Sequence, residues 1–437
     1  MAEADGTYQV QRGDTFSSLS RRFGVSVAEI QAANPKVVML KAGEKIIIPL
    51  NNVYLDTEPE ATVADEPMAN PVQTVPFEAK KSDDIVIALV LPFMLSQEEK
   101  EKPSQLFTEY YKGFLLAVDS MRACGKPIKV LAYDTKGTMQ GVKEVMTEPL
   151  LATAQVIIGP DDEAQIKVLA EYAKENGISV FNTFAARDKS YRTMDNVMNT
   201  IVPHTTMYAK AIQYFMKEFP DMEPVILCRK DGLSEKSEFI DSFKRQLDAA
   251  GRKYTYIEFE RQLSEDNLAD LSASGNYAFL PMSSKLSELK AILPQISVFA
   301  ANSKGKTSMW GYPEWLSFRG DPMSGMHKLN TYIFSRFYNT GKSDSSVRDV
   351  EDRFTKWYGG SMINVIPSQG LYGFDTAMYL LRALRVNDGD FNLYTPAYDG
   401  VQNCFNFARE DGAAGWVNNE MFIINYSRDG SINKYPL

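Results

Sequence analysis

From residue 84 onward, short apolar runs alternate with longer amphipathic stretches. The apolar runs are strand-sized, and several carry apolar residues at consecutive positions, as parallel strands buried on both faces do. They occupy residues 85–93, 128–133, 154–159, 178–182, 224–228, 254–259, 276–280 and 296–300. Between the runs, apolar residues recur at helical spacing, as at Tyr110, Phe114, Ala117 and Met121. This alternation predicts an α/β fold with parallel sheets.

The length of this pattern indicates how many structural units it forms. About 350 residues of strand–helix alternation exceed one doubly wound domain, so two lobes are expected. A (β/α)8 barrel is the structural alternative. The stretch after Asn387 has few helical signals and fits a barrel poorly, which favours two lobes.

Residues 7–50 form a separate block. The alternating stretch at 8–10 and the apolar run at 46–49 each predict a strand. Two helical segments lie between them, and the second opens on the capping box Ser26–Glu29. Asn34–Pro35 then stops this helix. The block is therefore predicted to be a small βααβ unit.

Residues 51–82 differ in composition from both neighbouring segments. They contain four prolines, six acidic residues and little periodicity. This composition predicts an extended, semi-rigid linker, reaching ~90 Å if it is polyproline-like at ~3.1 Å per residue. A loop packed on the next domain is the alternative. The expected organisation is thus a module at 1–50, a linker at 51–82 and a large domain at 83–437.

Composition excludes several classes of function. The formal net charge of −9 argues against a nucleic-acid partner, because phosphate binding needs a basic face. No run of 18 apolar residues is present, so no transmembrane segment is expected. The three cysteines and two histidines lie far apart and form no disulfide framework, metal site or His-based triad. No metal and no cofactor are therefore expected.

The pattern of the first block resembles the LysM family. The residues that carry the resemblance are Tyr8, Val10, Gly13, Asp14, Thr15, Leu19, Phe23, Gly24, Val25, Ile30, Asn34, Pro35, Leu40, Gly43, Ile46, Ile48 and Pro49. Phe16 stands where the family usually has Leu. LysM domains bind peptidoglycan or chitin-like glycan in a shallow groove between the loop after strand one and the loop before strand two.

The LysM resemblance implies which residues contact the glycan. Its two loops correspond here to Gly13, Asp14, Thr15 and Phe16, and to Ala33, Asn34 and Pro35. N-acetylglucosamine offers amide groups and a methyl group, which suit loop backbone, Asp14 and Phe16. The alternative is that Asp14, Thr15 and Asn34 serve only as caps and turn residues.

The large domain resembles the type I periplasmic-binding-protein fold of branched-chain amino acid receptors. The segments that carry the resemblance, in shared order, are Tyr111–Asp119, Ala132–Thr135, Val156–Pro160, Gly177–Asn182 and Gly373–Ala377. The resemblance implies two α/β lobes that close on a ligand at the carboxyl ends of their strands. We expect lobe one at 84–202 plus 331–395, and lobe two at 203–330 plus 396–437.

The resemblance implies that the ligand-binding loops lie at the inter-lobe cleft, and these loops contain Asp161, Asp162, Glu163, Thr183 and Phe184. The sequence departs from the receptor family in these loops. Amino-acid receptors follow Gly-Pro with a small hydroxyl residue, whereas this chain has three acids. Acids at a helix amino terminus cap the helix and repel a ligand carboxylate. A cation-selective cleft is the alternative. An ordinary amino-acid receptor is therefore disfavoured.

Three functions follow from these resemblances. In the first, a non-catalytic cell-envelope protein binds peptidoglycan and presents its large domain to a cell-wall synthesis protein. In the second, the large domain binds a small solute for a transport or sensing system. In the third, the chain is a LysM-anchored glycan hydrolase, for which Asp161, Asp162, Glu163, Glu314 and Asp375 are the candidate carboxylates, although nothing fixes a catalytic pair.

The family pairing also predicts the compartment. Both families act outside the cytoplasmic membrane, so an exported protein of the periplasm or cell envelope is expected. The first residues lack a basic and an apolar region, so any signal or lipoprotein leader is expected to be missing from this chain.

Overall fold

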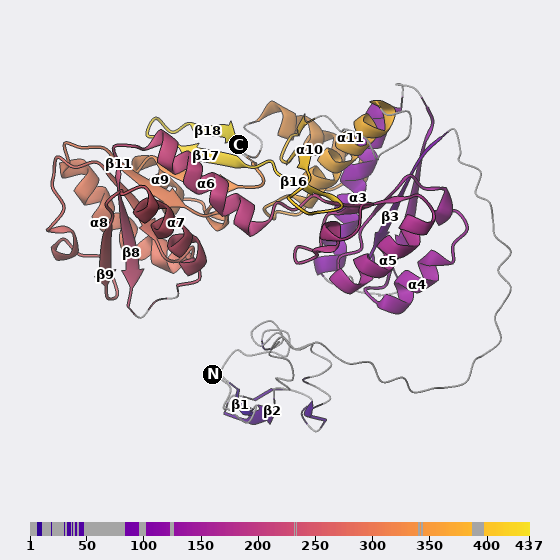
Figure 1. Cartoon of the computed structure of the whole chain (residues 1–437), viewed down its shortest axis with the longest axis horizontal. Coiled ribbons are helices and arrows are strands. Elements are labelled where there is room, and N and C mark those ends of the chain that lie inside the picture. Colours follow the sequence, from indigo (N-terminus) through magenta and orange to yellow (C-terminus); the bar gives the residue numbers. More distant parts are fainter. Residues whose placement is uncertain are drawn as a thin grey trace. The chain divides into compact units, whose positions relative to one another are not determined.

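The computed structural model contains two compact units, Met1–Val75 and Pro76–Leu437 (Figure 1). Each unit has its own hydrophobic core. The predicted linker at 51–82 lies outside the described residues. The residues that the structure describes are 7–10, 19, 30, 33–35, 37, 40–41, 43–47, 84–95, 102–122, 126–230, 232, 234–339, 341, 344–386 and 397–437.

The first unit is built on a pair of antiparallel strands. Strand β1 (Thr7–Gln9) pairs with β2 (Lys45–Ile47), and Tyr8 lies opposite Ile46. The core of this unit contains Tyr8, Val10, Leu19, Ile30 and Ile46. Leu19 and Ile30 are both helical, as the alternation of apolar and capping residues predicts.

The second unit contains two seven-stranded sheets. In the first sheet the strand order is β15-β16-β7-β6-β5-β3-β4, and neighbours are parallel except β15 and β16. The strands are β3 (Ile85–Leu91), β4 (Ile128–Asp134), β5 (Val156–Ile158), β6 (Ser179–Asn182), β7 (Val197–Asn199), β15 (Phe407–Ala408) and β16 (Trp416–Asn418).

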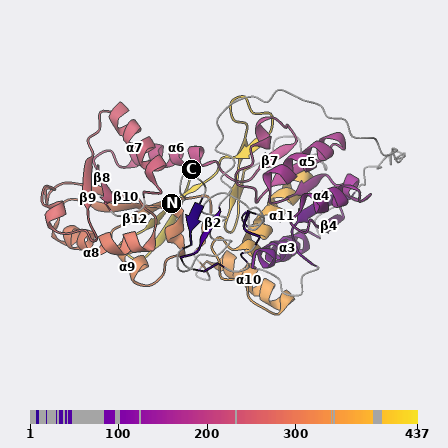
Figure 2. The ribbon, with the colours of Figure 1, turned by 90° about the horizontal axis from the view of Figure 1, so that it is seen from below.

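Every residue of strand β3 is apolar because the strand is buried on both faces. Successive side chains of a strand point to opposite faces. Ile85, Ile87 and Leu89 pack with α3 (Lys102–Met121), α10 (Ser345–Tyr358) and α11 (Gln369–Val386). Val86 and Ala88 pack with α4 (Met139–Met146) and α5 (Glu163–Glu175) on the other face. Both faces of the sheet are thus covered by helices (Figure 2).

Helices α3 and α11 meet closely through glycines. A Cβ atom on Gly113 would clash with the carbonyl of Gly370, and one on Gly373 would clash with the carbonyl of Tyr110. Only glycine permits so close an approach of two backbones. The glycines that carry part of the family resemblance are therefore required by packing.

The second sheet has the strand order β18-β17-β12-β11-β10-β8-β9. Its strands are β8 (Glu223–Arg229), β9 (Thr255–Phe259), β10 (Tyr277–Pro281), β11 (Thr307–Gly311), β12 (Thr331–Ser335), β17 (Phe422–Tyr426) and β18 (Ile432–Pro436). Helices α6 (His204–Glu218) and α7 (Ser237–Ala249) lie on one side of it. Helices α8 (Leu286–Asn302) and α9 (Asp321–Lys328) lie on the other side (Figure 2). Two parallel-dominated sheets covered by helices confirm the predicted fold class.

One predicted strand is wrong. The apolar run at 296–300 belongs to helix α8 rather than to a strand. Leu289, Ile292, Leu293 and Ile296 are buried at helical spacing, so the run is the end of an apolar helix face. A short apolar run alone does not distinguish a buried strand from a buried helix.

The chain crosses between the two lobes three times, after β7, after β12 and after β16. The predicted lobe boundaries differ from this arrangement at two places. Residues 331–335 form β12, which belongs to the second sheet because it pairs with β11 and β17. Residues 407–418 return to the first sheet, where β16 extends it beside β7. Between these, β13 (Tyr398–Asp399) and β14 (Cys404–Phe405) form a small antiparallel pair.

Among the described helices, none is long and apolar enough to cross a membrane.

Candidate functional site

The second predicted glycan-binding loop of the first unit is built around Asn34. Its side-chain amide donates to the carbonyls of Ile30 (2.7 Å) and Ile47 (2.6 Å), and its Oδ1 accepts from Ile47 N (2.8 Å). The side chain is buried, whereas Ala33 is partly exposed and Pro35 is exposed. Asn34 therefore joins the end of the second helical segment to β2. Glycan contact at 33–35 stays a prediction, and Gly13, Asp14, Thr15 and Phe16 lie outside the described residues.

The three acids after Gly159-Pro160 lie at the start of α5. Asp162 is the N-cap residue, and its Oδ1 accepts from Gln165 N at 3.1 Å. Glu163 occupies the first turn, where a negative charge is favourable, and both side chains are exposed. Asp161 is partly buried, and burial together with the charge of Asp162 raises its pKa. Asp162 thus caps the helix, as the first of the two sequence interpretations expects.

The loop that follows β6 is anchored by Asn182. Its Oδ1 accepts from Ala185 N at 3.0 Å, and its amide donates to Ala185 O at 2.9 Å. This folding directs Phe184 into an aromatic group, with ring centroids 5.0 Å from Phe107, 4.9 Å from Tyr110 and 6.1 Å from Tyr372. Phe184 is therefore packed against α3 and α11.

A cavity of about 140 Å³ lies where the crossing segments meet lobe one. It is lined in part by Thr183, Phe184, Thr200, Arg336 and Tyr372. The Tyr372 hydroxyl lies 2.7 Å from Thr200 Oγ1 and 3.2 Å from the Thr183 carbonyl. The structure thus brings Thr183 and Phe184 into one cavity, while the three predicted acids are not among the residues that line it.

Arg336 is the charged residue among those that line this cavity, and the sequence analysis did not identify it. It follows the last residue of β12 and is partly buried. Within the part of the chain that the structure describes, Arg336 forms no ion pair. No local motif marks it, because its position depends on β12 pairing in the second sheet.

The candidate hydrolase carboxylates have other partners. Asp375 is buried inside α11, where its carboxylate accepts from Val401 N (2.7 Å), Gln402 N (2.8 Å) and Asn403 N (2.8 Å). Burial raises the pKa of Asp375 to about 6, although these hydrogen bonds oppose the shift. Glu314 pairs with Lys236 at 2.6 Å. Asp375 therefore fixes the loop between β13 and β14.

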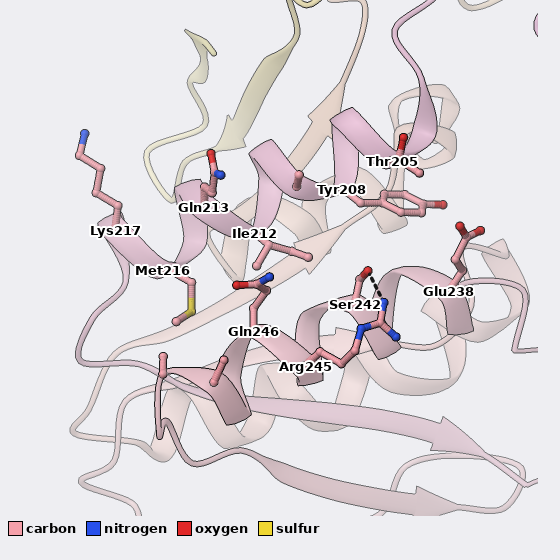
Figure 3. Close-up of a pocket in the computed structure, with 13 residues that line it drawn as sticks. Thr205, Tyr208, Ile212, Gln213, Met216, Lys217, Glu238, Ser242, Arg245 and Gln246 are labelled. Atoms are coloured by element: carbon pink, nitrogen blue, oxygen red, sulfur yellow. Dashed lines mark hydrogen bonds between the residues drawn. The ribbon is translucent and has the colours of Figure 1, made fainter. Parts of the chain in front are cut away.

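A larger groove of about 720 Å³ lies on lobe two, between α6 and α7 (Figure 3). Ile212 and Met216 point from α6 toward α7, and Gln246 points back from α7. Arg245 donates to Ser242 Oγ at 2.8 Å. Among the described residues, no group of three or more His, Cys, Asp or Glu side chains is placed to hold a metal ion.

Comparison with solved structures defines the class of the second unit. A putative branched-chain amino acid ABC transporter protein from Rhodospirillum rubrum superposes with a TM-score of 0.57 at 12% identity, covering 80% of this chain and all of that one. Full-length LpoA from Haemophilus influenzae gives a TM-score of 0.51 at 13% identity, covering 82% of this chain and 60% of that one. The LpoA C-domain gives the same TM-score and identity, covering 80% and 99%. At these identities the likeness shows the fold alone, which is that of type I periplasmic binding proteins.

The first unit is identified from its sequence. Residues 8–49 match the family described as LysM domain, which confirms the LysM resemblance. No curated protein sequence matches the chain. The chain therefore joins a LysM domain to a type I periplasmic-binding-protein fold.

Proposed function

We propose that this protein binds peptidoglycan through its LysM domain and presents its second unit to a protein partner in the cell envelope. The observation that carries the proposal is the family match over residues 8–49. The hydrogen bonds of Asn34 support it, because they fix the turn that the LysM family uses beside its glycan. A single shallow module binds weakly, so a second contact would add avidity.

Two observations support a protein-interaction role for the second unit. Ligand pockets for small molecules usually measure about 300–1,000 Å³, whereas the cavity beside Thr183 is about 140 Å³. Phe184 packs against Tyr110 on the lobe-one side of this cavity. In addition, the LpoA C-domain, which has this fold, is described as a regulator of PBP1A. The partner proposed here is accordingly a cell-wall synthesis protein.

Co-sedimentation of the full chain with purified insoluble peptidoglycan tests glycan binding. The double variant Asp14→Ala/Thr15→Ala is expected to lose most retention, because both residues lie in the predicted groove loop. The variant Asp352→Ala changes an exposed residue of α10 and serves as the matched control. A folded wild-type chain that stays in the supernatant would overturn the LysM part of the proposal.

Thermal unfolding with candidate ligands tests the role of the second unit. A small-solute receptor for transport or sensing is the second candidate, and it is favoured by Arg336, which could receive a small carboxylate. A ligand at 100 times its Kd stabilises the folded state by about 2.7 kcal/mol, a shift of a few degrees. We expect no such shift with amino acids or polyamines. A shift of that size would replace the protein-interaction role by the receptor role.

The chain is also proposed to be non-catalytic. Three of the candidate carboxylates have structural roles. Asp162 caps helix α5, Glu314 forms an ion pair with Lys236, and Asp375 accepts hydrogen bonds from the loop between β13 and β14. Incubating the protein with a peptidoglycan suspension should leave the turbidity unchanged. A steady loss of turbidity that disappears in Glu314→Gln, or in an Asp375→Asn protein shown to be folded, would instead support a hydrolase.

A further inference from the structure

A pocket of about 360 Å³ lies at the amino-terminal edge of the first sheet. Its lining residues immediately precede or begin the strands β6, β7 and β16, or follow β15, and α5 contributes its last turn. These residues are Lys174, Gly177, Ile178, Asp195, Asn196, Arg409 and Trp416. Thr183 follows the carboxyl end of β6, at the opposite edge of the sheet. The pocket is therefore separate from the cavity between the lobes.

Arg409 and Trp416 form one wall of this pocket. The guanidinium carbon of Arg409 lies 4.8 Å from the centre of the Trp416 ring. Arg409 is exposed, and it forms no ion pair with any residue in the described part of the chain. The neighbouring Glu410 pairs with Arg192 instead, at 2.8 Å. Stacking occupies a face of a guanidinium and leaves its in-plane N–H groups free for a planar carboxylate.

The opposite wall carries one positive and one negative side chain, Lys174 and Asp195. Lys174 Nζ lies 2.9 Å from Asp195 Oδ1, and both side chains are more than half exposed. Asn196 is buried, and its amide fixes this wall by donating to the carbonyls of Ala170 (2.9 Å) and Ile178 (3.2 Å). Its Oδ1 atom has no donor among the described residues. The three charged residues of the pocket leave an excess of one positive charge, on Arg409.

We infer that this pocket binds a carboxylate group of the peptidoglycan stem peptide. Arg409 receives the carboxylate, and the indole of Trp416 contacts the adjacent apolar part of the peptide. The Lys174–Asp195 pair can exchange partners with an ammonium or a second carboxylate of the same peptide. A pocket of about 360 Å³ accepts one or two peptide residues and excludes a whole glycan strand.

This inference rests on the proposed function, because peptidoglycan is the ligand that the LysM domain would select. The two contacts would then involve different parts of one polymer, sugar for LysM and stem peptide for the pocket. Linked weak sites on one polymer raise the overall affinity well above that of either site.

Tryptophan fluorescence of the full chain can isolate the pocket. Residues 1–83 contain no tryptophan, so a fluorescence change originates in the second unit. Trp310 and Trp315 are buried in lobe two, and Trp357 is exposed. In the Trp357→Phe protein, the indole of Trp416 is therefore the one that a soluble ligand can reach. The probe is a soluble disaccharide–tetrapeptide, with free tetrapeptide and N-acetylglucosamine oligomers as separate arms.

We expect a saturable fluorescence change with the disaccharide–tetrapeptide and with the tetrapeptide, and none with the oligomers. Arg409→Ala should weaken this binding about tenfold or more, because a charge-assisted bidentate contact is lost. Arg409→Lys should recover part of it, and Arg245→Ala on the other lobe should not change it. Because Arg409 is exposed, its replacement should leave the unfolding temperature unaltered.

The possible outcomes separate this inference from the proposed function. No fluorescence change with either peptide, while the chain still sediments with peptidoglycan, overturns the pocket and leaves the LysM role standing. Equal binding by wild type and Arg409→Ala also overturns it. A fluorescence change that survives in Asp14→Ala/Thr15→Ala, while this variant loses most of its sedimentation, supports two independent sites.

Discussion

Replacing Asp375 by asparagine should destabilise the second unit substantially. The carboxylate accepts three backbone N–H groups, those of Val401, Gln402 and Asn403. An asparagine has one acceptor oxygen and places an NH2 group against N–H donors, so at least one of these bonds becomes a donor–donor contact. Asp375 lies on α11 and this loop connects β13 to β14, so the variant should loosen the loop against lobe one.

The expected magnitude follows from two opposing effects. Each hydrogen bond to a charged acceptor contributes about 1.5–3 kcal/mol. Burial of the charge opposes this: a pKa of about 6 instead of 3.8 corresponds to about 3 kcal/mol. An asparagine oxygen keeps one or two of these bonds in weaker, neutral form. Replacing the others by donor–donor contacts while relieving the buried charge should therefore lower the free energy of unfolding by about 1–5 kcal/mol.

The pH dependence of this difference has a definite sign. Because the pKa of Asp375 is raised in the folded state, folded protein retains a proton between about pH 4 and pH 6 that unfolded protein releases. Stability contributed by this group is therefore present at low pH and is lost as pH rises through 6, by about 3 kcal/mol in total. The stability advantage of wild type over Asp375→Asn should shrink correspondingly and level off above pH 7.

Urea unfolding of both proteins at several pH values, followed by near-ultraviolet circular dichroism, measures this difference. The variant Asp352→Asn removes an exposed carboxylate of α10 and is the matched control, with an expected change within about 0.5 kcal/mol. If Asp375→Asn unfolds at the same urea concentration as wild type, the loop contact contributes nothing and the reasoning fails. A stability advantage that grows with pH would contradict the raised pKa.

Three further predictions concern packing and hydrogen bonding within the two units. Gly113→Ala should destabilise the protein by several kcal/mol in urea unfolding, because its Cβ meets the Gly370 backbone, whereas Gly360→Ala, which meets nothing, should change little. Asn34→Ala should abolish retention on peptidoglycan together with the amide exchange protection of β2, since it removes three hydrogen bonds. If protection persists while retention is lost, Asn34 contacts the glycan directly. Phe184→Ala should lower the free energy of unfolding by about 2–4 kcal/mol, and an unchanged value would mean that the aromatic group is not a packed unit.

Much of the fold could be predicted because strand and helix periodicities are local. The run 85–93 is apolar throughout, and β3 is indeed covered on both faces. The misassigned run 296–300 and the assignment of residues 331–335 to lobe one share another cause. Whether five apolar residues form a strand depends on partners far away in the chain, and β12 is defined by pairing with β11 and β17.

The site residues could be predicted less completely than the fold. Asn34 was identified from its position before a proline, but its bond to Ile47 joins residues 13 apart and needs the folded unit. Arg336 and Arg409 carry no sequence signal, since each is a single charged residue beside the end of a strand. Their roles depend on which side chains the sheets bring near them, and periodicity contains no such information.

The carboxy-terminal stretch of the chain has a consequence for synthesis. Residues 404–437 supply β15 and β16 to one sheet and β17 and β18 to the other. While the ribosome is still adding this stretch, β7 lacks β16 and β12 lacks β17. Each nascent lobe thus presents an open strand edge, the kind of surface that pairs wrongly with other chains. Both lobes are therefore expected to stay open to such mispairing until residues 404–437 have been added.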